Sequence, residues 1–447
     1  MEPLQRRMQE PDTNKKIALI ADDLTGANDT GVQFAKQGLK TIVLMGRDFP
    51  YGMSDDDVVV MDSQSRSLTP GEAYRKVAAL AVQVREGGFC TVFKKIDSTL
   101  RGNIGSEIDA VMDTCGQDLA VVVPAFPKNG RTTLGGYLLV HGAPLEATEV
   151  ARDPRCPVTE SHIPTLLAGQ TARQVGHVGI KSVAAGLESV LAAMERMIAA
   201  GKRVIVCDAW QEDHLRMAAA AAARLGRSIL WVGSAGLAEH LPSVLGLAAA
   251  PPRTNPRTCN PASGKPVLVL AGSISSVTQG QVRMLERRTD VVSVEADPCE
   301  LLKPEAAARE ITRCLEQALN AVKVGKDAVI TTGSNEDAMT VVREMHRAAE
   351  KIAAALGELC QSVATGATLS GLVLTGGDIA RSCCSHLLAT GIKLVEEAAP
   401  GIPLGLLKGG PCDGLQVVTK AGAFGTEDAL CEAVDFLKQG KREGTGK

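Results

Sequence analysis

Short apolar runs rich in valine and isoleucine alternate along this chain with longer segments in which alanine and leucine recur at helical spacing. Side chains repeat their direction every second residue in a strand and about every 3.6 residues in a helix, so the pattern predicts strands that alternate with helices. Strands that are apolar on both faces are typical of parallel sheets covered by helices on each side. The strands expected in the first part of the chain are KIALIAD, KTIVLMG, DVVVMDS, CTVFKKID, LAVVVPAF, KRVIVCDA and SILWVGS.

The clearest helix signals lie between the third and fourth of these strands, in LTPGEAYRKVAALAVQVREGG. Thr69 stands at the N-cap position, Pro70 at the first helical position, and Glu72 is placed to close a capping box with Thr69. Gly87 and Gly88 follow the last apolar position and favour termination. The sequence therefore predicts a helix that begins at Pro70 and stops at Gly87.

After residue 246 the apolar periodicity stops in LAAAPPRTNPRTCNPASGKP, whose composition is typical of a linker. A second series of strands follows, in PVLVLAGSISS, VVSVEADP, DAVITTGSNED, SGLVLTGGDIA and LQVVTKAGAFG. We therefore predict an α/β protein of two domains, 1–246 and 267–447, joined by a linker at 247–266. Each domain is expected to hold a largely parallel sheet flanked by helices, with the active site in the cleft between the domains.

Composition and charge exclude several classes of protein. With 48 Lys and Arg against 51 Asp and Glu, the net charge near −3 gives no overall field to hold nucleic acid or an anionic membrane. No apolar stretch reaches the ~18–20 residues that span a bilayer, and no secretory signal is recognisable, so a cytoplasmic protein is expected. The 12 Cys and 7 His lack the spacing of a disulfide framework or a zinc site, and no protein-held metal is predicted. The sequence leaves open whether the chain forms a homo-oligomer.

Charged and polar residues gather at the predicted strand ends of the first domain. In open parallel sheets, ligands bind beyond the carboxyl ends of the strands, so these side chains are expected to converge. Arg and Lys can hold a carboxylate while Asp, Ser and Asn exchange hydrogen bonds with hydroxyls, which together suit a small polyhydroxylated acid. An alternative role for Asp23 is to cap the following helix. The strand-end residues are Asp22, Asp23, Asp62, Arg66, Lys94, Lys95, Asp97, Ser98, Arg101, Lys128, Asn129 and Arg131.

The predicted strand ends of the second domain are instead small and rich in glycine, as in AGSISS, TTGSNE, TGGDIA and KAGAFG. Such turns let backbone N–H groups point at phosphate oxygens, and a helix that starts behind them adds a favourable dipole. The alternative is that each turn is a plain packing device. We interpret Ser273, Ser275, Gly376, Gly377 and Gly422 as a nucleotide cradle, although neither G-x-x-x-x-G-K-[ST] nor a dinucleotide fingerprint is present.

Five motifs occur in the order IADDLTGANDTG, KKIDSTLRGNIG, PAFPKNGRTT, AGSISSVTQ and LTGGDIA. Together they resemble the four-carbon acid sugar kinases over nearly the whole chain. The resemblance implies a sugar-acid-binding N-terminal domain, an ATP-binding C-terminal domain, and transfer of the γ-phosphoryl group to the 4-hydroxyl of the acid with the help of Mg²⁺. The TGGD motif is most similar to that of the members that act on D-threonate, with D-erythronate and 3-oxo-tetronates as the alternatives.

The resemblance also implies which residues contact each substrate, whereas their individual roles are inferred from the chemistry. Within the acid-binding set, either Asp97 or Asp22 is expected to take the proton of the attacking hydroxyl. The residues expected to contact the acid are Asp22, Arg66, Lys95, Ile96, Asp97 and Ser98. The residues expected to contact ATP are Ser275, Gly376, Gly377, Asp378, Ile379 and Gly422.

Two rival functions stay open. The first is a nicotinamide-dependent hydroxyacid dehydrogenase, which the missing dinucleotide fingerprint disfavours. The second is a non-catalytic sensor that closes around a sugar acid, which only the second, phosphate-like cradle disfavours.

Overall fold

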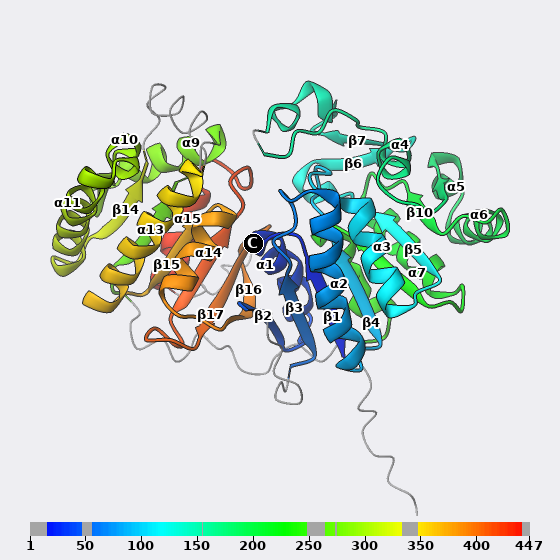
Figure 1. Ribbon diagram of the computed structural model, residues 1–447, viewed down its shortest axis with the longest axis horizontal. Coiled ribbons are helices and arrows are strands. Elements are labelled where there is room, and N and C mark those ends of the chain that lie inside the picture. Colours follow the sequence, from blue (N-terminus) through cyan, green and yellow to red (C-terminus); the bar gives the residue numbers. More distant parts are fainter. Residues whose placement is uncertain are drawn as a thin grey trace, which may run out of the picture.

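The computed structural model describes residues 16–46, 56–153, 155–247, 264–272, 275–332 and 347–439. We refer to residues 16–247 as the first half and to residues 264–439 as the second half. Figure 1 shows the two halves side by side, with sheet strands at the centre of each and helices on both faces. No helix in the described ranges is long and apolar enough to cross a membrane.

The first half contains eight strands of the main sheet, in the order β2-β3-β1-β4-β11-β5-β10-β9, and their pairings are parallel. All seven predicted strands are confirmed, and β9 is an addition that the short QVGHVG run did not reveal. The strands are β1 (Ile17–Ala21), β2 (Thr41–Leu44), β3 (Val58–Asp62), β4 (Thr91–Lys95), β5 (Leu119–Val123), β9 (Val175–Val178), β10 (Val204–Cys207) and β11 (Ile229–Gly233).

The second half contributes the order β13-β14-β12-β15-β18-β17-β16. The five predicted strands are confirmed and run parallel, whereas β16 and β17 are antiparallel strands that the sequence pattern did not predict. The strands are β12 (Val267–Ala271), β13 (Val291–Glu295), β14 (Asp327–Thr331), β15 (Gly371–Thr375), β16 (Gly391–Ala399), β17 (Ile402–Lys408) and β18 (Gln416–Lys420).

The two series of strands form one sheet rather than two. β2 of the first half pairs antiparallel with β16 of the second half, with Thr41 opposite Leu394 and Val43 opposite Ile392. The α/β fold is therefore confirmed, but its two parallel parts share a sheet through this pairing. The predicted linker falls mostly on residues 248–263, which lie outside the described residues, so the domain boundary stays a prediction.

The helix predicted at Pro70 is confirmed as α2 (Pro70–Glu86), with Gly87 at its C-cap. The Thr69 backbone N–H and hydroxyl both donate to Glu72, at 3.1 and 2.6 Å. The remaining helices are α1 (Leu24–Ala35), α3 (Ile104–Cys115), α4 (Ile163–Ala168), α5 (Ile180–Ala184), α6 (Leu187–Ala199), α7 (Glu212–Ala223), α8 (Ala235–Val244), α9 (Ser276–Glu286), α10 (Pro298–Leu302), α11 (Pro304–Lys323), α13 (Ala348–Gly366), α14 (Gly377–His386) and α15 (Ala429–Gln439).

A smaller antiparallel sheet stands beside the main one. It is made of β6 (Arg131–Leu134), β7 (Tyr137–Val140) and β8 (Ala143–Pro144), and it follows the short 3₁₀ turn η1 (Pro127–Asn129). Two further 3₁₀ turns, η2 (Leu145–Ala147) and η3 (Glu149–Arg152), come after it.

Helix α1 lies at the junction of the two halves, and all twelve of its residues are buried, including five polar ones. A helix that is buried on every side must satisfy its polar groups within the protein. Asn28 donates to the Thr419 hydroxyl at 3.1 Å, and Gln33 donates to Glu397 at 2.8 Å, both in the second half. The motif ANDTGVQ therefore builds an interface between the halves.

Candidate active site

The two carboxylates after β1 occupy different positions at the junction. Asp22 directly follows the strand, and Asp23 is the N-cap of α1, where its Oδ1 accepts the Gly26 N–H at 3.0 Å. The capping role considered for Asp23 is thus confirmed. Its other oxygen accepts the Thr25 hydroxyl at 2.6 Å, so Asp23 is held rigidly at the start of the helix.

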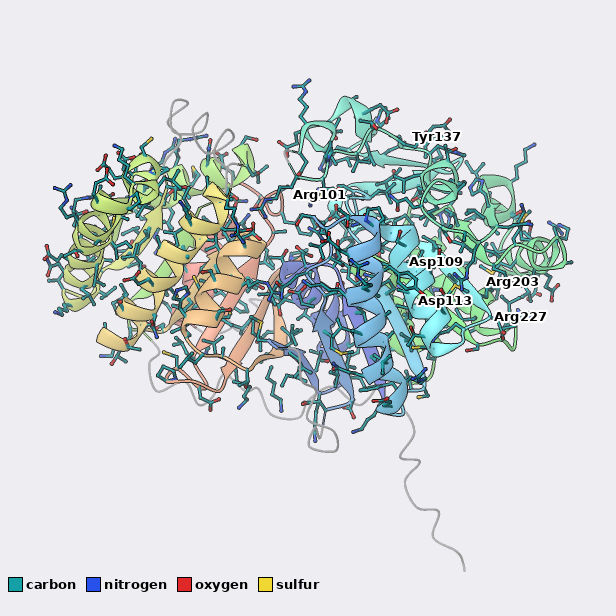
Figure 2. All side chains as sticks on the ribbon, viewed as in Figure 1. Arg101, Asp109, Asp113, Tyr137, Arg203 and Arg227 are labelled. Atoms are coloured by element: carbon teal, nitrogen blue, oxygen red, sulfur yellow. The ribbon has the colours of Figure 1, made fainter. Side chains whose placement is uncertain are left out.

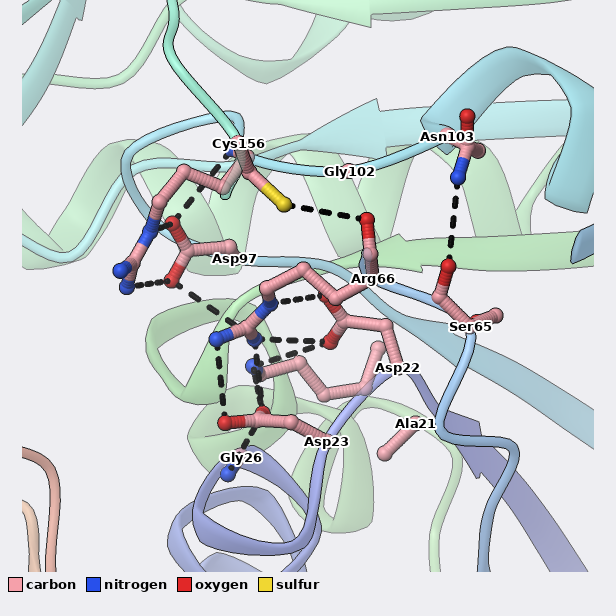
Figure 3. Close-up of polar contacts among 12 residues, drawn as sticks. Ala21, Asp22, Asp23, Gly26, Ser65, Arg66, Asp97, Gly102, Asn103 and Cys156 are labelled. Atoms are coloured by element: carbon pink, nitrogen blue, oxygen red, sulfur yellow. Dashed lines mark hydrogen bonds and ion pairs between the residues drawn. The ribbon is translucent and has the colours of Figure 1, made fainter. Parts of the chain in front are cut away.

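Arg66, which follows β3, binds both of these carboxylates (Figure 3). Its Nε and Nη2 donate to the two oxygens of Asp22 at 2.6 and 3.0 Å, and its Nη2 and Nη1 donate to the two oxygens of Asp23 at 2.7 and 3.0 Å. Two-point contacts of this kind are the strongest charge-assisted hydrogen bonds in proteins. The guanidinium thereby fixes the distance between Asp22 and Asp23.

The two lysines that end β4 point to opposite faces of the sheet, as adjacent strand residues must. Lys95 Nζ lies 3.8 Å from Asp22 and 3.9 Å from Asp23. Lys94 is fully buried on the other face and forms an ion pair with Glu107 at 2.7 Å. Lys94 therefore belongs to the packing against α3 and is not part of the site, contrary to the strand-end expectation.

Asp97 and Arg101 complete what we call the charged cluster. Arg101 donates to the two oxygens of Asp97 at 2.8 and 3.2 Å and reaches Asp153 at 3.0 Å, while Arg66 lies 3.9 Å from Asp97. Figure 2 shows Arg101 on the side of the first half that faces the second half. The charged cluster consists of Asp22, Asp23, Arg66, Lys95, Asp97 and Arg101.

These contacts keep the acids ionised. Burial acts to raise the pKa of Asp22, but Arg66 and Lys95 outweigh it and bring the pKa down to about 2. Burial likewise acts to raise the pKa of Asp97, yet Arg101 and Arg66 hold it well below its usual range. Both groups are therefore carboxylates near neutral pH and can accept hydrogen bonds from substrate hydroxyls.

A cavity of about 330 Å³ opens beside the cluster, between Arg66, Gly102 and the segment from Arg155 to Glu160. Cys156 in that segment donates from Sγ to the Arg66 carbonyl at 3.2 Å, and Asn103 donates to the Ser65 carbonyl at 3.2 Å. The sequence patterns gave no signal for residues 155–160, because this wall comes from an irregular segment far along the chain.

The two remaining acid-set residues are both buried. Ser98 is 5% exposed and lies in the turn that also carries Asp97. Ile96 packs in the core, and its backbone N–H donates to the Gly233 carbonyl at 2.9 Å. The Ile96 side chain therefore packs in the core and anchors the turn that carries Asp97 and Ser98.

The predicted nucleotide set lies at the strand ends of the second half. Gly376 adopts a left-handed backbone, with φ of 97°, immediately before α14, whose first residue is Gly377. Such a turn into a helix presents unpaired N–H groups. Asp378 is exposed on the first turn, and Ile379 is buried.

The other members of this set occupy two further turns. Ser275 is the N-cap residue of α9, and Ser273 lies outside the described residues. Gly422 lies in the turn after β18, where its carbonyl accepts the Thr278 hydroxyl at 2.8 Å and Lys420 Nζ at 3.3 Å.

The two sets meet at the junction of the halves. A β-carbon built on Gly377 would lie 3.4 Å from Asp23 Oδ2, so the N-termini of α14 and α1 face each other. Arg155 binds Asp378 at 2.8 Å, and Arg381 forms an ion pair with Asp62. The sequence-predicted residues of both halves are thus neighbours in space, and Arg155 and Arg381 are contacts that the patterns did not reveal.

Comparisons with known proteins agree with this division. A model of a sugar-binding N-terminal domain matches residues 17–241, and a model of a nucleotide-binding C-terminal domain matches residues 268–430. The chain is 36% identical over 435 residues to D-threonate kinase of Salmonella typhimurium, which covers 95% of this chain and 99% of the relative. It is 35% identical over 438 residues to D-erythronate kinase of Heliobacterium modesticaldum, covering 94% and 97%.

Solved structures share the fold. A protein of Salmonella typhimurium LT2 superposes with a TM-score of 0.77 at 25% identity and covers 94% of this chain and 98% of its own. Haemophilus influenzae protein HI1011 superposes with a TM-score of 0.69 at 24% identity, covering 93% and 98%. The sugar-binding model matches the first half, the nucleotide-binding model matches the second half, and the kinase relatives match nearly the whole chain. The chain is therefore a member of the four-carbon acid sugar kinase family.

Proposed function

We propose that this kinase uses ATP to phosphorylate the 4-hydroxyl of a four-carbon sugar acid, with D-threonate as the first candidate. The observation that carries the proposal is the position of the charged cluster next to the N-terminus of α14, with Gly377 beside Asp23. Phosphoryl transfer depends on placing an acceptor hydroxyl and a phosphate together and on neutralising charge, rather than on covalent catalysis.

Lys95 is proposed to bind the carboxylate of the acid. Its nearest acidic oxygens lie 3.8 and 3.9 Å away, whereas Arg66 and Arg101 hold their carboxylates in two-point contacts. Of the three cations in the charged cluster, Lys95 thus has the longest distances to its carboxylate partners. Arg66 keeps the carboxylates of Asp22 and Asp23 in place. We retain the hypothesis from the sequence that Arg66 also contacts the sugar acid.

Asp22 and Asp97 are proposed to orient the hydroxyls of the acid. Both are ionised, and each is a candidate to accept the proton of the attacking hydroxyl. Their lowered pKa values make them weak proton acceptors, so their main contribution is expected to be the alignment of the hydroxyl oxygen.

The turns around Gly376, Gly377 and Gly422 are proposed to hold the phosphates of ATP through backbone N–H groups. Gly376 has a left-handed φ that a residue with a β-carbon would adopt only with strain. The N-terminus of α14 behind it supplies backbone N–H groups suited to a phosphate. Mg²⁺ on the phosphates would supply charge neutralisation, and Asp378, the acidic side chain of this set, is paired with Arg155 at 2.8 Å.

The choice of acid follows the relatives. D-threonate kinases and a D-erythronate kinase match at 34–36% identity, and a 3-oxo-tetronate kinase of Brucella melitensis matches at 28% over 444 residues. These acids differ by one stereocentre or one oxidation level. We therefore rank D-threonate and D-erythronate above the oxo acids.

The test is to incubate the purified chain with ATP, Mg²⁺ and each stereoisomeric four-carbon acid, to follow ADP release, and to locate the phosphorylated carbon by NMR. ADP release with D-threonate and a phosphate on carbon 4 supports the proposal. A change in nicotinamide absorbance with NAD and the acid would identify a dehydrogenase instead. Binding of the acid without turnover would identify a sensor.

A further inference from the structure

Arg131 is a buried arginine at the junction of the halves. It is the first residue of β6, directly after the turn η1, and it is 7% exposed. The backbone fixes this start of the strand, because the Arg131 N–H donates to the Phe126 carbonyl at 3.0 Å and the Phe126 N–H donates back at 2.8 Å. The guanidinium therefore projects from a rigid support.

No carboxylate of the described residues lies within 4.0 Å of Arg131. Its Nη1 donates to the Asn129 carbonyl, and its buried Nε has no hydrogen-bond partner among the residues that the structure describes. Arg66 and Arg101, by contrast, each hold carboxylates at two points. A buried cation is costly unless an anion or several acceptors compensate it. Arg131 thus has the surroundings of a residue whose anionic partner is a ligand.

A second donor stands next to it. The amide nitrogen of Asn129 is buried and also has no partner in the described part of the chain. It faces the second half, because a β-carbon on Gly401, at the turn between β16 and β17, would lie 3.1 Å from it. Two unsatisfied donors on one turn, a guanidinium N–H and an amide N–H₂, form the kind of group that binds a phosphate oxygen.

Arg131 also touches the second half directly. Its guanidinium lies over the ring of Phe424, 5.2 Å from the ring centre. Phe424 follows Gly422 in the turn after β18, and that turn is held in place by Lys420 Nζ, which donates to the Phe424 carbonyl at 3.1 Å, and by Gln281, which donates to the same carbonyl at 3.0 Å. Arg131 is therefore set against the turn assigned to the nucleotide.

We propose that Arg131 and Asn129 form an anion site on the first half that receives the terminal phosphate of the bound nucleoside triphosphate. The inference rests on the proposed function and extends it: the second half holds the nucleotide, and the first half recognises that it is a triphosphate. A guanidinium suits the three outer oxygens of a terminal phosphate. The nucleotide would then be bound by groups of both halves.

The test compares nucleotides that differ by this phosphate. Titration calorimetry with Mg²⁺ measures the affinity of wild type and Arg131→Gln for ADP and for a non-hydrolysable ATP analogue. Loss of a charged hydrogen-bond partner should weaken binding of the analogue about 10- to 100-fold, with ADP affinity changed less than about twofold. Arg131→Lys should recover part of the loss. Thermal unfolding of each variant verifies that it is folded.

Lys128→Gln is the matched control, because Lys128 lies in the same turn but is paired with Glu239 at 2.6 Å in its own half. It should leave the ratio of the two affinities unchanged. The inference is overturned if Arg131→Gln weakens both nucleotides equally or neither, or if it weakens only the acid, which would make the acid's carboxylate the partner. If wild type binds the acid but no adenine nucleotide, the proposed function fails as well.

Discussion

Arg66 and Asp22 are joined by two hydrogen bonds, from Nε to Oδ2 at 2.6 Å and from Nη2 to Oδ1 at 3.0 Å, although 44 residues separate them in sequence. The pair ties the end of β3 to the end of β1. Arg66 therefore has a structural role in addition to any contact with the acid, and removing it leaves a carboxylate buried without its main counter-ion.

Arg66→Ala should lower the free energy of unfolding by about 3–5 kcal/mol, because it strands the charge of Asp22 in a buried site. The double variant with Asp22→Asn should recover part of this loss, since the stranded charge is gone. Urea unfolding measures both values. Arg224→Ala, which breaks an exposed pair with Glu188, should leave the free energy of unfolding nearly unchanged, because solvent screens the pair. Equal stability of Arg66→Ala and wild type would contradict the prediction.

The identity of the proton acceptor can be separated from substrate binding by kinetics. Asp97→Asn is nearly isosteric but cannot take a proton, and it should lower kcat about 10²–10⁴-fold if Asp97 is the general base. Asp22→Asn is the companion variant. Loss of kcat only in Asp22→Asn would assign the base to Asp22. Near-normal kcat in both would mean that alignment and charge neutralisation, without a general base, carry the reaction.

Asp29 on α1 should make stability depend on pH. Burial, with Glu397 and Asp23 nearby, raises the pKa of Asp29 to about 7 against the pull of Lys95, and its Oδ1 has no partner among the described residues. The folded protein thus holds this proton more tightly than the unfolded chain. The resulting stability is complete below pH ~4 and is lost as the pH rises through ~7.

Asp29→Asn removes this titration. Relative to wild type, the variant should gain roughly 2–4 kcal/mol between pH 5 and pH 8, measured by urea unfolding at both values. A gain that is the same at both pH values would show that Asp29 does not titrate in this range. If Asp29→Asn also lowers kcat, the destabilising carboxyl is retained for function, as strained groups at active sites often are.

Gly26→Ala should weaken binding of the acid without unfolding the protein. A β-carbon there would lie 2.1 Å from Lys95 Nζ, the flexible end of the side chain proposed to bind the carboxylate. Lys95 must therefore move away, together with Asp23 Oδ1, which lies 2.6 Å from the same position, and the acid's affinity should fall about tenfold or more by calorimetry. Gly71→Ala, in the first turn of α2 with open surroundings, is the control. Unchanged affinity in Gly26→Ala would argue against Lys95 as the carboxylate partner.

Limited proteolysis should cut first within residues 247–266 if these join two folded domains. The fragments should nevertheless elute together on size exclusion, because β2 pairs with β16 and α1 is buried between the halves. Initial cleavage within KKIDSTLRGN would contradict the boundary. Separation of the fragments after cleavage at the linker would contradict the stability of the shared sheet.

Local patterns in the sequence determined the elements and the chemistry of their ends. Continuous apolar runs marked twelve strands, and the Thr69, Pro70 and Glu72 signals marked α2. These features are readable because strand period, capping and turn chemistry act over a few residues. The strand-end rule also placed Asp22, Arg66 and Asp97 together, since parallel strands deliver their ends to one edge.

Tertiary structure decided which groups are paired and where the halves join. The segments of β16 and β17 include Pro403, Gly405 and two glutamates, so their sequence did not predict strands. Their pairing with β2 and β18 is seen only in the tertiary structure. Lys94 and Arg131 looked alike at strand ends, yet Lys94 forms an ion pair with Glu107, whereas Arg131 has no carboxylate of the described residues within 4.0 Å. Pairing between residues distant in sequence depends on burial and orientation, which local periodicity does not encode.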